Sequence, residues 1–312
     1  MEELNKNPIL EFNENQLQAV RQAHGYEDVN KLKQDIELLK EWIQKQNHFK
    51  IKDFDPGYLE RLLIYNKGSI ERTKQRFDKF CTFINLMPDF LQNFDIKNEF
   101  RPLLSMGNIA VLPKPTSDNY RVIISQTNGS FDNDFQLIDY YRYHVVIAHH
   151  ALCNDYCHGF VVIFDARNLA LNLVTKCNPI TINKGLMLLV EAMGMRLKKL
   201  HLISGSKLFD TFLMIVKQGL SEKLRNRLMV HSTVEGLQDY IPREQLPVDF
   251  GGDERSVKEL NDMNFEEWSS DSHIANVKFM ESAATDESSR LVCKFNEEYS
   301  GMPGSFRTLC VD

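Results

Sequence analysis

The chain has 312 residues, enough for one large domain and a smaller one, and it is 43% hydrophobic and 26% charged, a balance typical of globular rather than disordered proteins. Its apolar runs fall short of the ~20 residues that span a bilayer, and the acidic start Met1-Glu-Glu-Leu-Asn-Lys lacks a secretory signal. A net charge of −6 argues against nucleic acid as a partner, and six scattered cysteines fit a reducing cytosol, so we expect a cytoplasmic protein.

Residues 1–100 have the pattern of consecutive helices. Apolar residues recur at the 3.6-residue period from Leu32 to Ile43. Asp55-Pro56 is a helix cap followed by proline at the first helical position. Gly68-Ser69 then ends that helix and caps the next one. We expect a small helical domain here, without a site of its own.

After residue 100 the pattern changes. Short β-branched or aromatic runs at 120–125, 160–165 and 200–204 are separated by helices, one over 134–152 and one opened by Asn178-Pro179. This alternation predicts an α/β fold with a mainly parallel sheet. The middle run is apolar at five consecutive positions, as expected for a strand that is covered on both faces.

No motif for catalysis follows these strands. The residues after Asp165 read Ala-Arg-Asn-Leu, without the glycines that let a backbone approach a pyrophosphate, and the chain has no Walker A loop or Gly-x-Ser-x-Gly elbow. Gly205-Ser206-Lys207 follows a strand and opens a helix, so an anion could bind there, but Ser206 as an N-cap is the simpler interpretation. We expect that the protein is not an enzyme.

A group of histidines and cysteines suggests a metal site at first sight. On a continuous helix, His149, Cys153 and Cys157 fall at positions i, i+4 and i+8, on one face. Three ligands on successive turns span about 12 Å at 1.5 Å per residue, whereas a tetrahedral zinc ion binds at about 2.0–2.3 Å. We therefore predict no metal site, and interpret the cysteines as core residues.

An amphipathic helix is predicted over residues 207–220. Its polar side carries Asp210, Thr211 and Lys217. Its broad apolar face consists of Leu208, Phe209, Phe212, Leu213, Ile215, Val216 and Leu220. The periodicity alone does not separate a movable lid from a helix that is packed permanently on the core.

Four segments in this order and spacing resemble the CRAL-TRIO lipid-binding family, and most closely its animal branch of α-tocopherol transfer protein-like carriers. They are Ile163-Phe-Asp165, His201-Leu-Ile203, the helix from Leu208 to Lys217, and Leu246-Pro-Val-Asp-Phe-Gly-Gly252. The resemblance implies a sheet that forms the floor of a lipid pocket, helical walls and a movable lid helix. It also implies an N-terminal helical domain over 1–100 and a lipid-binding domain over 101–252. We expect a C-terminal helix and a mobile tail over 253–312, because residues 281–312 are rich in Ser, Glu and Gly and poor in periodicity.

Matching to tocopherol carriers implies a set of pocket residues. They are Tyr141, His144, Val145, Ala148, Phe160, Val162, Phe164, Leu188, Leu189, Leu200 and Leu202. Tocopherol carriers have serines where His144 and Ala148 stand, which leaves the identity of the lipid open. Tyr141 and His144 are the candidates for a contact with a hydroxyl or carbonyl group. The alternative for His144 is a core histidine bonded to the backbone.

The same matching implies a basic site for phosphoinositide head groups at Arg196, Lys223 and Arg227, with Lys217 nearby. Lys223 and Arg227 are spaced i, i+4, as on one helical face, and cations beside a lid suit docking on an anionic membrane. The alternative is an ordinary solvated helix face. The family's further arginine in the N-terminal domain is missing, and Lys67 is the candidate to replace it.

The expected function is that of a monomeric carrier for one hydrophobic molecule, with no cofactor apart from the bound lipid. α-Tocopherol or a related isoprenoid, such as a retinoid or a carotenoid, is the expected ligand, and the protein is expected to associate peripherally with anionic membranes. The alternatives are a phospholipid-exchange protein and a lipid-sensing adaptor.

Overall fold

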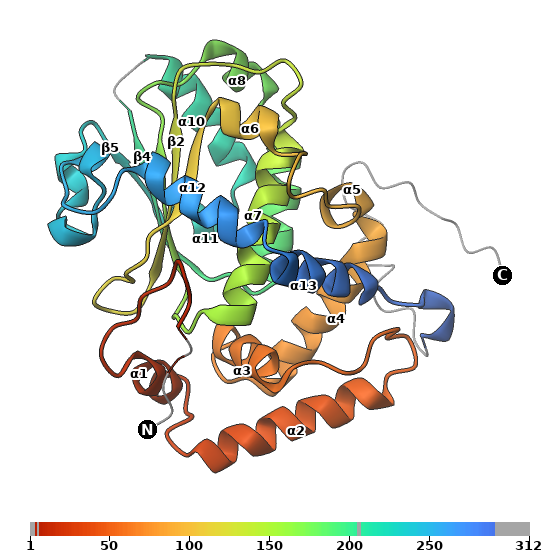
Figure 1. Ribbon diagram of the computed structural model, residues 1–312. Helices are drawn as coiled ribbons and strands as arrows, with labels where there is room; N and C mark the ends of the chain where they lie inside the picture. Colours follow the sequence, from red (N-terminus) through yellow and green to blue (C-terminus); the bar gives the residue numbers. More distant parts are fainter. Residues whose placement is uncertain (1–3, 5, 205–206, 291–312) are drawn as a thin grey trace.

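The computed structural model describes residue 4 and residues 6–204 and 207–290. It contains a five-stranded sheet in the order β1-β2-β3-β4-β5, with the N-terminal helices α2, α3 and α4 at one end (Figure 1). The first strand pairs antiparallel with the second, and the other pairs are parallel, which confirms the predicted α/β fold. The strands are β1 (Gly107–Val111), β2 (Arg121–Thr127), β3 (Phe160–Asp165), β4 (Leu197–Ile203) and β5 (Leu228–His231).

Helices precede the sheet, and several of them pack against the helix that connects β2 to β3. Asp55 accepts a hydrogen bond from the Tyr58 amide at 2.9 Å, and Ser69 accepts one from the Arg72 amide at 3.3 Å, so both predicted caps are confirmed. Gly68 between them has φ 68°, a conformation that glycine adopts readily. The helices are α1 (Gln16–Ala23), α2 (Val29–Lys45), α3 (Pro56–Tyr65), α4 (Ile70–Leu86), α5 (Pro88–Leu91) and α6 (Arg101–Ser105).

The remaining helices connect the parallel strands or follow the last one. The predicted helix 134–152 is α7 (Leu137–Asn154), which links β2 to β3. Asn178 caps the next long helix, as predicted, through a 2.8 Å bond from the Ile180 amide. The others are α8 (Leu171–Lys176), α9 (Pro179–Leu186), the π-helical segment η1 (Met187–Ala192), α10 (Lys207–Gly219), α11 (Glu222–Arg225), α12 (Val257–Trp268) and α13 (Asp271–Ser282).

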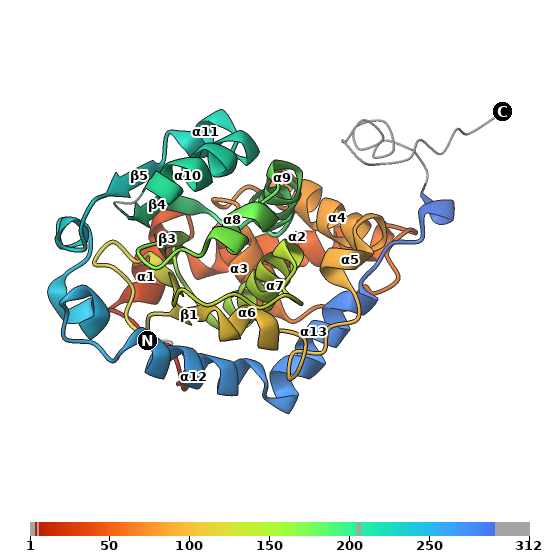
Figure 2. The same cartoon turned by 90° about the horizontal axis from the view of Figure 1, so that it is seen from above.

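Helix α12 covers the edge of the sheet at β1. The carboxamide oxygens of Asn261 and Asn264 accept hydrogen bonds from the amides of Ile109 and Val111, at 3.0 and 2.6 Å. These two amides lie at alternate positions of β1 and point away from β2, toward the edge of the sheet. The two asparagine side chains therefore accept the hydrogen bonds that a further strand would otherwise accept. Figure 2 shows α12 along one side of the sheet and α10 and α11 on the opposite side.

The string 246–252 closes the face of the sheet that is turned away from α7. Leu246 and Phe250 are fully buried against a cluster that includes Val161 and Ile163 of β3. Gly251 has φ 74°, and a Cβ on Gly252 would lie 1.9 Å from the carbonyl oxygen of Leu246. The two glycines of this segment are therefore required by backbone conformation and close approach.

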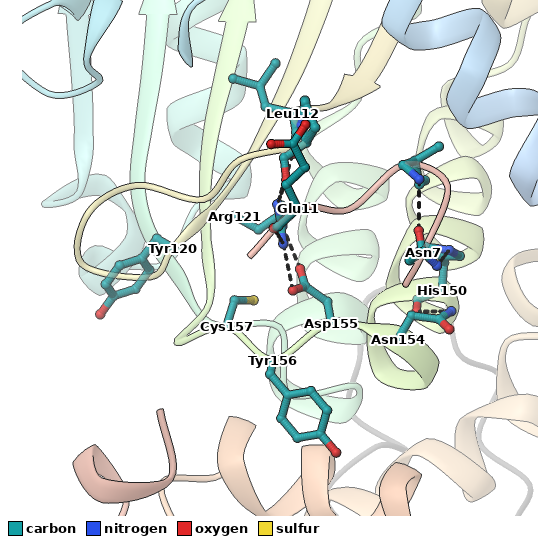
Figure 3. A network of polar contacts seen from close by, with 12 residues as sticks. Asn7, Glu11, Leu112, Tyr120, Arg121, His150, Asn154, Asp155, Tyr156 and Cys157 are labelled. Atoms are coloured by element: carbon teal, nitrogen blue, oxygen red, sulfur yellow. Dashed lines mark hydrogen bonds and ion pairs between the residues drawn. The ribbon is translucent and has the colours of Figure 1, made fainter. Parts of the chain in front are cut away.

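A buried ion pair connects β2 to the end of α7 (Figure 3). Nε and Nη2 of Arg121 donate to the two carboxylate oxygens of Asp155 at 2.8 and 2.9 Å. The same guanidinium donates to the carbonyls of Glu11, Leu112 and Pro113. One side chain thus ties the N-terminal segment, the end of β1 and α7 together.

Residues 281–290 differ from the prediction, which placed them in a mobile tail. Ala283, Ala284 and Thr285 are buried, and Arg290 donates to both carboxylate oxygens of Asp78 on α4, at 2.8 and 2.9 Å. A low hydrophobic periodicity had suggested a tail, but polar contacts hold this segment. The rest of the predicted tail, 291–312, and the proposed cap at Gly205-Ser206 lie outside the described residues.

Within the described ranges, none of the helices combines the length and apolar character that crossing a bilayer requires.

Candidate functional site

An apolar cavity of about 210 Å³ lies between the sheet, α7, α9 and α10. Its floor consists of two rows of side chains that run across neighbouring strands. In one row Ile123, Val162 and Leu200 are register partners in β2, β3 and β4, and in the next Ser125, Phe164 and Leu202 are. Because side chains alternate between the two faces of a strand, every second residue of these strands faces the cavity.

Nine of the eleven predicted pocket residues line this cavity. They are Tyr141, His144, Ala148, Phe160, Val162, Phe164, Leu189, Leu200 and Leu202. The placement of Val145 and Leu188 was wrong, since both are 0% exposed in the core and absent from the lining. Val145 follows His144 by one residue, so helical geometry turns it about 100° away. Leu188 lies in the π-helical segment, where the ordinary helical period does not apply.

Several lining residues were missed from the sequence. Ile123, Ser125 and Thr127 line the cavity from alternate positions of β2. The serine and threonine among apolar neighbours were a detectable signal of that face. Leu186, Val190 and Leu197 were missed for another reason, because the π-helical segment η1 and its junctions with α9 and β4 decide which of their side chains face inward.

The polar groups of the lining are few. Tyr140 and Ser125 satisfy each other through a hydroxyl–hydroxyl bond of 3.2 Å. The ring of His144 bonds through Nδ1 to the carbonyl of Tyr140 at 2.8 Å. Its other nitrogen, Nε2, has no hydrogen-bond partner among the described residues. His144 is therefore both a backbone-bonded histidine and a cavity residue.

His149 and Cys157, two of the three residues of the candidate metal site, lie outside the cavity. His149 packs edge-on against Phe80 of α4, and the Cys157 thiol lies 3.5 Å from the Tyr65 hydroxyl. Burial lowers the pKa of His149 to about 3, with His273 as a second cause, so its imidazole is neutral. These groups belong to the packing between α7 and the N-terminal helices.

Helix α10 closes the cavity. Phe212 and Val216, together with Leu220 just after the helix, contribute to the lining, and the ring of Phe212 stacks on Phe164 at 5.2 Å. The other residues of the predicted apolar face, Leu208, Phe209, Leu213 and Ile215, pack against the neighbouring apolar cluster. With this helix in place the volume is below the ~300–1,000 Å³ of typical small-molecule pockets. A larger ligand would require Phe212 to move.

A second hollow, which we call the basic groove, lies on the other side of α9 and has a volume of about 1310 Å³. The N-terminal helix α4 and the segment 219–227 form its walls. Five of its cations are Lys67, Arg72, Arg196, Lys223 and Arg227. Lys67 lies in the turn between α3 and α4, and Arg72 lies on α4, so this groove combines two parts of the chain that are far apart in sequence.

The charges of the groove are only partly compensated. Its acidic residues are paired, Glu71 with Lys74, Asp78 with Arg290 and Glu191 with Lys79. Neither Lys67 nor Lys223 forms an ion pair within the described residues. The pKa of Lys67 is lowered, first by the charge of Arg196 and then by burial and by Arg72, Lys223 and Arg227. An uncompensated cluster of this kind favours an anion.

Two details of the predicted basic site are corrected by the structure. Arg227 does not share a helical face with Lys223, because α11 is a single turn that ends at Arg225, and Arg227 instead donates to the carbonyl of Leu197. Lys217 lies outside the groove, in a separate shallow hollow with Asp210 and Arg225. Arg72 was missed, although its position near the start of α4 placed it close to Lys67.

The cavity and the basic groove share part of their walls. Leu186, Val190 and Leu197 line both. A movement of α9 or η1 would therefore affect the apolar and the charged site together.

The CRAL/TRIO domain family matches residues 105–252. The alpha-tocopherol transfer protein-like proteins of Mus musculus, Pongo abelii and Homo sapiens are each 21% identical over 221 residues, which is 70% of this chain. The match spans 64% of the length of these relatives. A crystal structure of Sfh5 is similar at a TM-score of 0.48 and 12% identity, over 74% of this chain and 91% of that one.

Proposed function

We propose that this chain, in which residues 105–252 match the CRAL/TRIO domain family, is an intracellular carrier of one hydrophobic small molecule. The observation that supports this proposal is the apolar cavity under α10. α-Tocopherol or a related isoprenoid, such as a retinoid or a carotenoid, fits a lining with so few polar groups. No chemical step on the ligand is part of the proposal.

Release and uptake require that α10 opens. Its outer surface carries the exposed side chain of Met214, and Leu171 of α8 and Ile180 of α9, the two helices that α10 contacts, are also exposed. Apolar side chains on the helices around a lid suit contact with the interior of a membrane. We propose that the lid opens on a membrane surface, where the ligand passes directly between two apolar environments.

The basic groove is the proposed docking site for an anionic phosphoinositide head group. Lys67, Arg196 and Lys223 lie in it without acidic partners among the described residues, and each cation near an anionic surface contributes about 1 kcal/mol. Lys67 takes the place of the arginine that the N-terminal domain lacks, and Arg72 adds a further charge.

The experiment is transfer of α-tocopherol from the loaded protein to vesicles with and without a phosphoinositide. Reversal of two groove charges, K67E with K223E, should slow transfer to the anionic vesicles at least tenfold and leave transfer to neutral vesicles nearly unchanged. Added salt should likewise slow transfer of the wild type to the anionic vesicles and leave transfer to the neutral ones nearly unchanged. It screens the attraction between the groove and the head groups by shortening the Debye length, which is about 8 Å at physiological ionic strength. The affinity for α-tocopherol in solution should stay the same, because neither lysine lines the cavity.

The matched control is K33E with K278E, which makes the same change of charge at two exposed lysines of α2 and α13 that line neither the groove nor the cavity. This variant should transfer to phosphoinositide vesicles within about threefold of the wild type. Equal slowing of both double variants would show that only net charge matters, and equal rates of the groove variant on both kinds of vesicle would refute docking through the groove. A protein that takes up neither α-tocopherol nor retinol but still binds phosphoinositide vesicles would instead be an adaptor.

A further inference from the structure

His144 is a polar residue of the cavity, on α7, whose hydrogen-bonding role is fixed by its surroundings. Its Nδ1 lies 2.8 Å from the carbonyl oxygen of Tyr140, one turn earlier on α7. A carbonyl has no proton to give, so Nδ1 must carry the proton and donate. The neutral ring with a proton on Nδ1 has a lone pair on Nε2, and such a nitrogen can only accept.

The charge of the ring follows from its position. His144 is only 8% exposed, and burial lowers its pKa to about 4, against the opposing effect of the bond to Tyr140. At neutral pH the imidazole therefore carries no proton on Nε2. This atom is buried and finds no partner among the described residues, and leaving a buried acceptor unpaired is costly.

The neighbouring polar groups impose no such restriction. Tyr140 and Ser125 are bonded to each other. The Tyr141 hydroxyl, on the same side of α7, can rotate and either donate or accept. Among these groups, His144 alone distinguishes a donor from an acceptor.

We propose that His144 selects for a hydrophobic ligand with a hydroxyl group, an alcohol or a phenol, that donates a hydrogen bond to Nε2, and against ligands whose only polar group is a carbonyl, an ether or an ester. This inference rests on the proposed carrier function and narrows its substrate class. A carbonyl oxygen near Nε2 would bring two acceptors together, so both would remain unpaired. A site whose buried group needs a hydrogen-bond donor discriminates strongly against an analogue that lacks this donor, because the buried group is then left unpaired.

The test compares two probes of nearly equal shape, all-trans-retinol, which donates, and all-trans-retinal, which only accepts. The wild type should bind retinol about tenfold more tightly, a factor that corresponds to about 1.4 kcal/mol. H144L should lose this preference by weakening retinol alone, and H144Q, with an acceptor and a donor, should bind both probes. Y141F, one turn earlier on the cavity face, should keep the wild-type ratio, and melting curves establish that all variants are folded.

The ratio of the affinities for retinol and retinal should also stay constant from pH 8 to pH 6, because the imidazole of His144 is neutral throughout this range. Equal affinities for the two probes in the wild type, a preference that survives H144L, or one that disappears in Y141F would overturn the role of His144 while leaving the carrier function intact. A shift toward retinal as the pH falls to 6 would show a protonated ring and overturn it as well. Failure to take up retinol, retinal and α-tocopherol alike would refute the carrier function itself, and the selectivity with it.

Discussion

Two charged side chains of this protein, Arg121 and Asp155, have a structural role in its interior. Arg121 and Asp155 have the charges of surface residues, yet both are about 1% exposed and lie where the N-terminal segment, β2 and α7 meet (Figure 3). Their burial is tolerated because the carboxylate and three backbone carbonyls satisfy the guanidinium. An arginine within an apolar strand was therefore a sign of a specific partner.

The substitution D155N should lower the free energy of unfolding by about 3–5 kcal/mol, because it leaves the guanidinium of Arg121 buried without a counter-charge. The measurement is urea denaturation at neutral pH. D262N serves as the control, since the pair between Asp262 and Lys258 is exposed on α12 and such pairs contribute about 1 kcal/mol or less. Losses of similar size in the two variants would contradict the assigned role of the buried pair.

Among the elements, α10 differs from the other helices that flank the sheet. Two of its apolar side chains, Phe212 and Val216, enter the cavity, and its polar residues Asp210 and Lys217 are exposed. It rests on side chains that surround an incompletely filled space, whereas β3, which borders the same space, is held by hydrogen bonds to β2 and β4 on its two edges. Segments with fewer buried contacts open more readily, which is the physical basis for a lid.

Hydrogen exchange should therefore be faster in residues 207–219 than in residues 160–165 of the protein without ligand. Adding α-tocopherol should slow exchange in α10 and change β3 little, because the ligand would supply the contacts that the helix lacks. Mass spectrometry of peptic peptides measures both segments in one experiment. Equal protection of the two segments, unaffected by the ligand, would mean that α10 is a fixed wall of the core.

At the scale of the whole molecule, the order of helices and parallel strands was predictable, because periodicity, caps and apolar runs are local signals. β1 and β5 were not predicted, since a strand that begins with Gly107-Asn108 and one of four residues have weak patterns of their own. The floor residues of β3 and β4 were predicted through the family resemblance, and in the structure they occupy alternate positions of each strand. The π-helical wall did not, because a π turn is set by packing and has no period that a sequence displays.

The basic groove could also be predicted only in part from the sequence. Arg196 and Lys223 were found through resemblance, whereas Arg72 comes from α4, more than 100 residues earlier. Only the packing of α4 against η1 brings these charges together. Figure 2 shows α4 close to α9, the helix that leads into η1. A net charge of −6 gave no indication of a local cluster of cations.

The central claim, that the cavity holds one hydrophobic molecule, is tested most directly by native mass spectrometry after the purified protein has been offered α-tocopherol, retinol and phosphatidylcholine together. We predict one small lipid on each chain of the wild type and of V162A. V162W should carry none, because the indole fills the space above the floor of the cavity, and it should still fold, since overpacking costs about 1–3 kcal/mol. Equal loading of V162W, or no loading of the wild type with any of the three, would contradict the account.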